Sequence, residues 1–293
     1  MIGHKHIWDR LKNDLELGRL AHAHLFVGPA HTGKTHLAKT FSVIAQGGDS
    51  DVLLKKSILE GTEADTVMFL DNGEPLTIEE VRTISARAGQ SHTRPYLIFV
   101  VEDLGRMKPE AANSLLKTLE EPSEGTVFFL TANNEDSVLA TIRSRCTVTR
   151  FQSVPDAEMR AACGEHVYAD ELVFFSMGAP GKLMRLMEDS DYFAAHREIL
   201  ADVTVFLDRP SVPAAFQLVR KYEGSPVRDE MLDVLLRRVR ASGAAGAGGG
   251  ALGLDKIAFL EQIEEAKRRI DANVNARLTL ENLLLSFVPG TLL

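Results

Sequence analysis

Residues 28 to 35 combine glycine, lysine and threonine in a spacing that suits phosphate binding. The segment Gly28-Pro-Ala-His-Thr-Gly-Lys34-Thr35 fits the pattern G-x-x-x-x-G-K-[ST] at every required position. In such a loop, backbone N–H groups curl around a phosphate, and the following helix presents the positive end of its dipole. The lysine reaches the β- and γ-phosphates, and the threonine hydroxyl completes a Mg²⁺ shell. The alternative is an ordinary glycine-rich turn. The predicted nucleotide-binding residues are Gly28, Pro29, Ala30, His31, Thr32, Gly33, Lys34 and Thr35.

A pair of acids follows a second apolar run. Residues 97–101 read Leu-Ile-Phe-Val-Val and lead directly into Glu102 and Asp103. In phosphate-loop ATPases, one carboxylate at the end of a buried strand holds Mg²⁺, and a neighbouring carboxylate activates water. We therefore expect Glu102 to join Thr35 at the metal, and Asp103 to be the catalytic carboxylate. The alternative is a buried strand that meets solvent at a polar turn.

Short apolar runs alternate with helical stretches from residue 1 to about residue 152, and these elements must hold the site. This alternation is typical of a parallel sheet with helices on both faces. The predicted strands are residues 24–27, 67–70, 96–101, 126–131 and 147–151. The predicted helices are residues 6–18, 34–46, 78–88, 109–120 and 137–142. Residues 49–66 are charged and weakly patterned, which favours loop and a short helix. The expected fold class is α/β.

Local signals mark the ends of two of these helices. Thr77 and Glu80 have the spacing of a capping box at the start of the third predicted helix. Pro109 suits the first position of the fourth helix, and Pro122 suits its end. Both helices should therefore begin at these residues.

The chain divides into three parts in this interpretation: a nucleotide-binding core of residues 1–152, a small helical part of residues 153–189, and an all-helical part of residues 190–293. The small part contains a helix start near residue 154 and a helix over residues 182–188. The last part contains helical patterns over residues 192–207, 212–222, 227–240 and 256–285. A glycine- and alanine-rich connector, residues 241–254, joins the last two and is typical of a flexible loop.

Composition narrows the class of protein. The chain has 293 residues, 45% hydrophobic and 25% charged residues, and a formal net charge of −8. This charge argues against a protein that grips DNA with its whole surface, because phosphate neutralisation needs clustered Lys and Arg. No apolar run approaches the roughly 20 residues of a membrane helix, and the first residues have no signal-peptide pattern. Only Cys146 and Cys163 are present, so we expect no disulfide framework and a cytoplasmic protein without membrane contact.

Four segments together resemble a known family. Residues 113–122 read Asn-Ser-Leu-Leu-Lys-Thr-Leu-Glu-Glu-Pro, and residues 144–146 read Ser-Arg-Cys. With the entry segment 19–29 and the closing helix 273–285, they resemble the clamp-loader ATPases of the AAA+ superfamily over nearly the whole chain. Within that family, the chain is most similar to delta-prime subunits of bacterial DNA polymerase III.

The resemblance implies an AAA+ core, a small lid domain and a helical collar that holds the subunits in a hetero-pentamer. It implies ATP and Mg²⁺ as cofactors. The implied partners are gamma/tau-type and delta-type subunits, a sliding clamp, and primed DNA reached through the assembly. It makes Asn133 the sensor of the γ-phosphate and Arg145 an arginine finger for a neighbouring subunit's ATP site. We expect Cys146 to be a small buried residue rather than a nucleophile, since no positioned base is evident.

Three departures from the family pattern affect the expected activity. Motor subunits carry Asp then Glu, whereas this chain has Glu102 then Asp103, so we expect ATP binding with weak or absent hydrolysis. The lid position that should carry a phosphate-facing arginine holds Gly181, with Lys182 beside it, and Lys182 is either a substitute charge or a solvated lysine. Residues 47–66 contain no cysteine, so the four-cysteine zinc module is absent. Two alternatives remain: a competent gamma/tau-type motor, and an assembly scaffold that binds no nucleotide.

Overall fold

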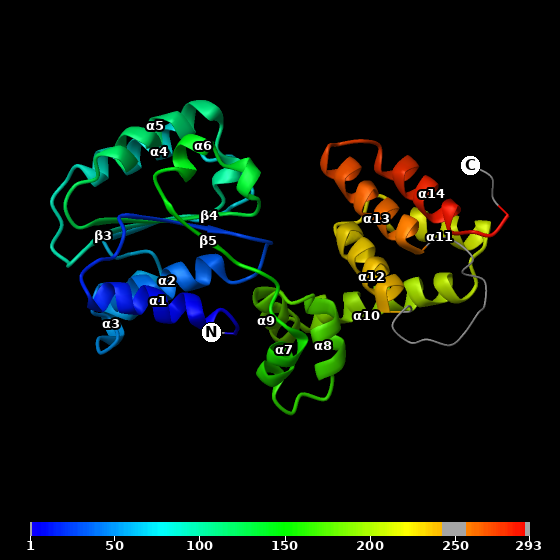
Figure 1. Cartoon of the computed structure of the whole chain (residues 1–293). Helices are drawn as coiled ribbons and strands as arrows, with labels where there is room; N and C mark the ends of the chain where they lie inside the picture. The colour runs from blue at the N-terminus through cyan, green and yellow to red at the C-terminus, as the bar shows by residue number, and fades with distance from the viewer. Residues whose placement is uncertain (1, 242–255, 291–293) are drawn as a thin grey trace. The chain divides into compact units, whose positions relative to one another are not determined.

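The computed structural model describes residues 2–241 and 256–290 (Figure 1). The chain forms two compact units, Met1–Met184 and Arg185–Leu293. The expected boundaries at residues 152 and 189 stay predictions. None of the helices in the described ranges is long and apolar enough to cross a membrane.

The first unit is built around a five-stranded parallel sheet with the strand order β2-β3-β4-β1-β5. The strands are β1 (Ala23–Val27), β2 (Thr66–Phe69), β3 (Leu97–Val101), β4 (Thr126–Ala132) and β5 (Thr147–Arg150). All five predicted strands are confirmed, and no strand begins or ends more than one residue from its predicted position.

The three central strands are apolar along almost their whole length because helices cover both faces of the sheet. Every residue of β1, β3 and β4 is buried. The expected α/β class with helices on both faces is confirmed, since α4, α5 and α6 lie on one side of the sheet and α1, α2 and α3 on the other (Figure 1). These helices are α1 (Lys5–Glu16), α2 (Lys34–Ala45), α3 (Val52–Leu59), α4 (Ile78–Ala88), α5 (Pro109–Glu120) and α6 (Ala140–Arg143).

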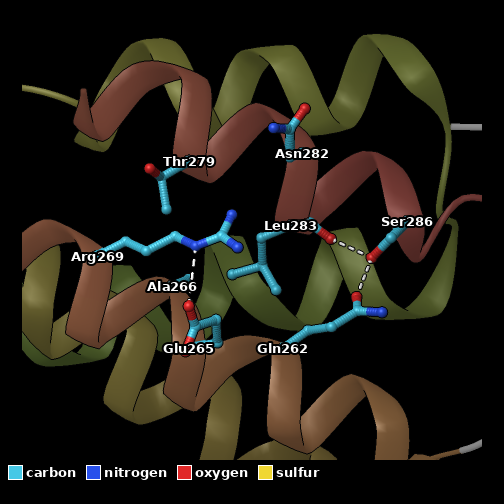
Figure 2. Close-up of a pocket in the computed structure, with 8 residues that line it drawn as sticks. All are labelled: Gln262, Glu265, Ala266, Arg269, Thr279, Asn282, Leu283 and Ser286. Carbon is cyan, nitrogen blue, oxygen red and sulfur yellow. Dashed lines mark hydrogen bonds and ion pairs between the residues drawn. The ribbon is translucent and has the colours of Figure 1, made fainter. Parts of the chain in front are cut away.

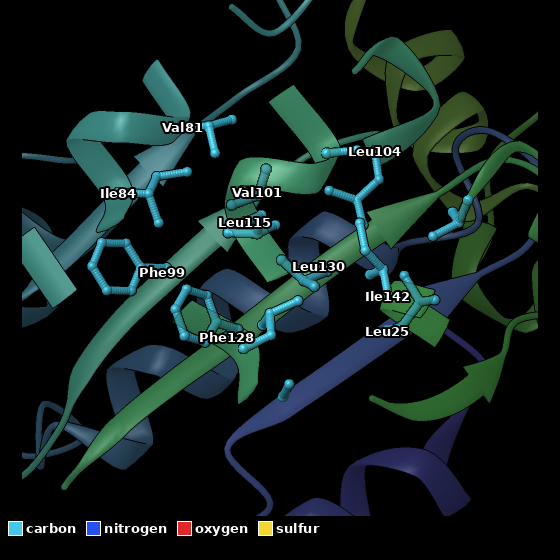
Figure 3. Close-up of a cluster of buried hydrophobic side chains, with 14 of the residues drawn as sticks. Leu25, Val81, Ile84, Phe99, Val101, Leu104, Leu115, Phe128, Leu130 and Ile142 are labelled. Carbon is cyan, nitrogen blue, oxygen red and sulfur yellow. The ribbon is translucent and has the colours of Figure 1, made fainter. Parts of the chain in front are cut away.

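The larger hydrophobic core lies between the sheet and helices α4 and α5 (Figure 3). Phe99 of β3 and Phe128 of β4 stack with their ring centroids 5.0 Å apart. Leu115 of α5 and Ile84 of α4 are fully buried against them. On the opposite face, Phe129 packs with the aromatic side chains of α2 and β1. The sheet is therefore held from both sides.

The predicted starts of α4 and α5 are confirmed. Thr77 caps α4, and the reciprocal contact from Glu80 completes the capping box. Pro109 occupies the first turn of α5. One predicted helix, residues 137–142, is wrong in detail because the α-helix α6 starts only at Ala140. Ser137 instead ends the 3₁₀ helix η2 (Glu135–Ser137), which the side chain of Asn134 caps. A second 3₁₀ helix, η1 (Leu104–Arg106), follows β3.

Three helices follow the sheet in the chain: α7 (Asp156–Cys163), α8 (Ala169–Ser176) and α9 (Pro180–Glu188), whose residues from Arg185 onward belong to the second unit. The helix start predicted near residue 154 and the helix predicted over residues 182–188 are both present. The sequence analysis missed α8, whose buried residues include Leu172, Val173 and Phe175. A short apolar run of this kind has no clear period, so it does not distinguish a strand from a buried helix.

In its described residues, the second unit contains the helices α10 (Ser190–Asp208), α11 (Val212–Tyr222), α12 (Arg228–Ala241), α13 (Lys256–Asp271) and α14 (Ala276–Ser286) and no strand. The single helix predicted over residues 256–285 is wrong, because the chain turns between α13 and α14. Asn273 has a left-handed φ of 59°, and the side chain of Asn275 caps α14. The predicted connector, residues 241–254, lies outside the described residues apart from Ala241.

His24 is a polar residue inside this apolar sheet. It lies on β1 with 2% of its surface exposed, and its ring stacks on Phe129 with centroids 5.3 Å apart. Neither ring nitrogen makes a hydrogen bond of normal geometry within the described part of the chain. Burial disfavours the charged ring and lowers the pKa of His24 to about 4, although an interaction with the Ala21 backbone acts in the opposite direction. Folding therefore requires a neutral imidazole here.

Replacing His24 with leucine should make the protein more resistant to acid. Because the pKa of His24 is lower in the folded state than in the unfolded state, stability falls as the pH drops from 6.5 toward 4. His24→Leu removes this loss, which amounts to about 2 kcal/mol at pH 5. Urea unfolding at pH 8 and pH 5 measures the difference. The control Leu25→Met should shift stability equally at both pH values, and a His24→Leu variant that behaves the same way would contradict this account.

Candidate nucleotide site

The phosphate loop joins β1 to α2 and requires glycine at two positions. Gly28 has a φ of 152°, and a Cβ there would lie 2.2 Å from the carbonyl oxygen of Phe151. Gly33 has a φ of 97° and sits at the N-cap of α2. Any other residue would be strained at both places. The glycines of the motif are therefore needed for the path of the backbone itself.

The loop is closed by contacts among its own residues. His31 also has a positive φ, 61°, and the Thr32 hydroxyl donates a hydrogen bond to the Pro29 carbonyl oxygen at 2.8 Å. Alternating backbone conformations of this kind turn successive N–H groups toward one side, which creates a concave site for an anion.

Lys34 is 6% exposed, and its ammonium contacts the backbone of the loop. It donates to the carbonyl oxygens of Gly28 at 2.6 Å and Pro29 at 2.7 Å, and to Oδ1 of Asn133 at 3.1 Å. Burial lowers the pKa of Lys34 to about 8, although Asp103 and Glu102 act in the opposite direction. The charge of the Lys34 ammonium is costly to bury, and a phosphate bound in the loop would stabilise it.

Thr35 and Glu102 bring two oxygens together at the end of β3. The Thr35 hydroxyl donates to Oε1 of Glu102 at 2.6 Å, and the backbone N–H of Asp71 donates to Oε2 at 3.1 Å. A hydroxyl and a carboxylate at this separation are the hard oxygen donors that Mg²⁺ prefers. The residues present fit the metal that was expected.

Asp103 and Asn133 form the next part of the site. Nδ2 of Asn133 donates to Oδ2 of Asp103 at 2.9 Å, while Oδ1 of Asn133 accepts from Lys34. Asp103 has a left-handed φ of 52°, and its backbone N–H donates to the Thr131 hydroxyl at 3.0 Å. Asn133 thus links the loop lysine to the second acid.

These groups line a pocket of about 310 Å³. Its lining residues are Ala30, His31, Gly33, Lys34, Thr35, His36, Asp71, Glu102, Asp103, Thr131, Asn133 and Gly181. Three predicted binding residues, Gly28, Pro29 and Thr32, shape the loop without lining the pocket. The remaining predicted residues of the loop, the two acids and Asn133 are brought together.

Sequence reasoning missed Asp71 and the arginine that holds it. Asp71 follows β2, which pairs in parallel with β3, so both strands end at the same edge of the sheet. Nε of Arg106 lies 3.2 Å from Oδ1 of Asp71, and its Nη2 donates to the Glu102 carbonyl oxygen at 2.9 Å. The signal was available: a polar pair, Asp71 and Asn72, ends a predicted strand beside the one that carries Glu102.

The start of α9 contacts the phosphate loop directly. The backbone N–H of Gly181 donates to the His31 carbonyl oxygen at 2.8 Å, and a Cβ at Gly181 would lie 3.1 Å from the same oxygen. A larger side chain at this position would require the loop or the start of α9 to shift by a few tenths of an ångström. Lys182 is not among the residues that line the pocket. The lid position therefore contributes backbone, and no cationic side chain, to this pocket.

Arg145 lies far from the pocket. It comes just before β5, whose Thr147 pairs with His24 near the start of β1, whereas the phosphate loop begins where β1 ends. Because the two strands are parallel, about 10–13 Å of strand separates the level of Thr147 from the loop, and Arg145 precedes Thr147 by two residues. The Arg145 side chain is 32% exposed and pairs with Glu120. Arg145 therefore lies at the edge of the sheet where β1 and β5 begin, opposite the edge that carries the phosphate loop.

The expectation that Cys146 is buried is wrong, because this residue is only half-buried. It follows the turn after α6 and lies at the edge of the larger core, where it packs against the buried residues. Desolvation raises the pKa of its thiol to about 12. A thiol with this pKa is a poor nucleophile at neutral pH.

A second cavity, of about 480 Å³, lies between α13 and α14 of the second unit (Figure 2). Its polar groups pair with one another: Ser286 donates to Gln262 at 2.6 Å, and Arg269 donates to Glu265 at 3.0 Å. None of the residues predicted for nucleotide binding lies there. The phosphate-loop pocket is therefore the candidate site.

Comparison with known families agrees with this geometry. A family model described as DNA polymerase III, delta subunit, matches residues 3–155, which is more than half of the chain. The matched segment contains the phosphate loop, both acids, Asn133 and Arg145.

Similar sequences come from the same replication machinery. The tau subunit of DNA polymerase III from Bacillus subtilis is 29% identical over 180 residues, covering 59% of this chain and 32% of that protein. The gamma subunit from Buchnera aphidicola is 32% identical over 167 residues, covering 54% of this chain and 46% of that protein. The chain thus matches about a third to a half of the length of these curated relatives.

A solved structure shares the fold. The crystal structure of a DNA polymerase III gamma subunit-related protein from Thermotoga maritima matches with a TM-score of 0.52 and 18% identity, covering 95% of this chain and 98% of that one. At this identity the match concerns the fold alone. The AAA+ fold expected from the sequence is confirmed.

Replacing Gly28 with alanine should destabilise the protein by about 2–3 kcal/mol, because the new Cβ would overlap the Phe151 carbonyl oxygen. Thermal unfolding of Gly28→Ala measures this loss. The matched control is Gly89→Ala, where φ is −85° and the nearest atom to a Cβ would be 3.7 Å away. The control should change stability by less than about 0.5 kcal/mol. Equal effects of the two variants would contradict the close approach at Gly28.

Proposed function

This chain belongs to the DNA polymerase III delta-subunit family, a clamp-loader family with the AAA+ fold, and we propose that it is a delta-prime-like clamp-loader subunit. In this proposal it binds ATP with Mg²⁺ at its own phosphate loop and supplies Arg145 to the ATP site of a neighbouring subunit. The observation that carries the proposal is the separation of these two features. The pocket lies at one edge of the sheet, and the arginine lies at the other.

ATP binding is supported by the residues that meet in the pocket. Lys34 places a buried ammonium beside the loop, and the backbone of residues 30–33 curls toward the same space. Thr35 and Glu102 would hold Mg²⁺, which neutralises charge on the phosphates when bound. Asn133 would contact the γ-phosphate from the side of the pocket that faces Lys34. All these groups belong to the same unit of the chain.

Weak hydrolysis follows from the order of the acids. Glu102 reaches Thr35 with the longer side chain, and Asp103 stands in the second position with one methylene fewer than a glutamate. Both oxygens of Asp103 already accept hydrogen bonds, from Asn133 and from the backbone N–H of Gly105. A misplacement of about 1 Å costs about 10²-fold in rate. We therefore propose binding with slow turnover.

The role of Arg145 rests on its charge and its place. A guanidinium stays protonated and offers a planar fork of donors to phosphate oxygens. An arginine finger supplied by a neighbour is worth about 10³–10⁵ in turnover. Because Arg145 lies at the opposite edge of the sheet from its own pocket, it suits a neighbour's nucleotide. Its partners would be gamma/tau-type and delta-type subunits in a cytoplasmic hetero-pentamer that places a sliding clamp on primed DNA.

A competent gamma/tau-type motor is the second candidate. The similarity to tau and gamma subunits over more than half of this chain favours it, together with the intact loop and the Thr35–Glu102 contact. The two proposals differ in turnover by this chain alone. An assembly scaffold without nucleotide is a third outcome that the same measurements detect.

The isolated chain should bind ATP in the presence of Mg²⁺ and hydrolyse it about 10²-fold more slowly than its motor partner. Calorimetry measures affinity, and release of inorganic phosphate measures turnover. Lys34→Ala should weaken binding by at least about tenfold, because it removes a charged donor from the pocket. Turnover by the isolated chain at the rate of its motor partner would favour the gamma/tau-type function. Absence of binding by the unmodified chain would favour the scaffold.

Arg145→Ala should remove most of the increase in ATP turnover that this chain produces when it joins its partner subunits. The physical reason is loss of the positive charge at the neighbour's triphosphate. Phosphate release by the reconstituted complex, with and without this chain, measures the increase.

The matched control is Arg150→Ala, which removes a 67% exposed arginine paired with Glu135 near the other end of β5. This control should leave the increase intact. If Arg145→Ala also leaves it intact while the complex still assembles, the finger assignment is wrong.

A further inference from the structure

We propose that Glu120 is the residue that positions Arg145 for its neighbour, an inference that rests on the proposed function of Arg145. Glu120 is the last residue of α5, and Arg145 follows the turn that ends α6. They are 25 residues apart in sequence, yet Nη2 of Arg145 donates directly to Oε1 of Glu120. The end of one helix thus holds the side chain that follows another.

Two further contacts hold the same guanidinium. Nη1 of Arg145 donates to the Thr141 carbonyl oxygen at 2.7 Å and lies 3.3 Å from the Ser144 hydroxyl. Both partners come from α6 and its C-cap, so the guanidinium is held close to the turn from which its own side chain extends. Glu120 is a contact from a different element, the end of α5. Among the described residues, no other charged group pairs with Arg145.

The pair is too exposed to be needed for folding. The Arg145 side chain is 32% exposed and the Glu120 side chain 47% exposed. Ion pairs in such surroundings contribute little to stability, because water screens them and holding two long side chains costs entropy. The contact therefore restricts the direction of the arginine with little effect on the fold.

Restricting the arginine matters for a reaction in a neighbouring subunit. A free arginine side chain loses much rotamer freedom when it docks on a phosphate, whereas a held one has already lost part of it. Three of the five N–H groups of Arg145 face contacts within its own chain. The guanidinium stays positively charged throughout, so it retains donors and charge for phosphate oxygens.

Glu120→Gln is the central test, in the complete complex reconstituted with its partner subunits. Glutamine keeps the size of the side chain and removes its charge. The kcat of the complex for ATP hydrolysis should fall by about three- to tenfold, with little change in KM for ATP.

The control is Glu121→Gln, the exposed neighbour at the same helix end, whose carboxylate makes no ion pair within residues 2–241 and 256–290. This control should leave kcat unchanged. Thermal unfolding should give equal Tm values for all three proteins.

A double variant separates positioning from any other role. In the Arg145→Ala background, Glu120→Gln should cause no further loss, because there is no arginine left to hold. A full extra loss in that background would overturn the proposal, as would an unchanged or higher kcat for Glu120→Gln alone. Either outcome would remove the role of Glu120 but not the proposed arginine finger, provided that Arg145→Ala lowers turnover. An Arg145→Ala complex with normal turnover instead removes the proposed function and this inference together.

Discussion

The arrangement of the site depends on one constraint: neighbouring strands of the sheet run parallel and in a fixed register. β1, β4 and β3 lie side by side, so their carboxyl ends meet at one edge. That edge receives the phosphate loop from β1, the two acids from β3 and Asn133 from β4. Ligands commonly bind outside the carboxyl ends of strands in open α/β sheets for this reason. The core on both faces of the sheet keeps the register, and therefore the site, in place.

The same constraint separates the pocket from Arg145. β5 is the outermost strand beside β1 and runs parallel to it. Arg145, which comes just before β5, therefore lies where the strands begin, opposite their carboxyl ends. A subunit with an acceptor site at one edge and a donor at the other suits head-to-tail contacts, in which different surfaces of two chains meet. The second unit contributes the helices α10 to α14.

Much of this could be predicted from the sequence, because the signals were local. The phosphate-loop spacing, the apolar runs and the capping box at Thr77 depend on neighbouring residues, and all are present as expected. The prediction failed where tertiary contacts decide. The single helix over residues 256–285 is divided by the left-handed Asn273, and α8 has no readable period. The contacts of Asp71 with Glu102, and of Glu120 with Arg145, join residues about 25–31 positions apart and leave no local pattern.

The environment of Lys34 has a consequence for the strength of ligand capture. The Lys34 ammonium donates to two carbonyl oxygens of its own loop and to the Asn133 amide oxygen. An incoming phosphate must therefore exchange with these internal acceptors instead of meeting a bare cation. The measured affinity reports the difference between two sets of hydrogen bonds, so a structurally complete loop can still bind its nucleotide weakly.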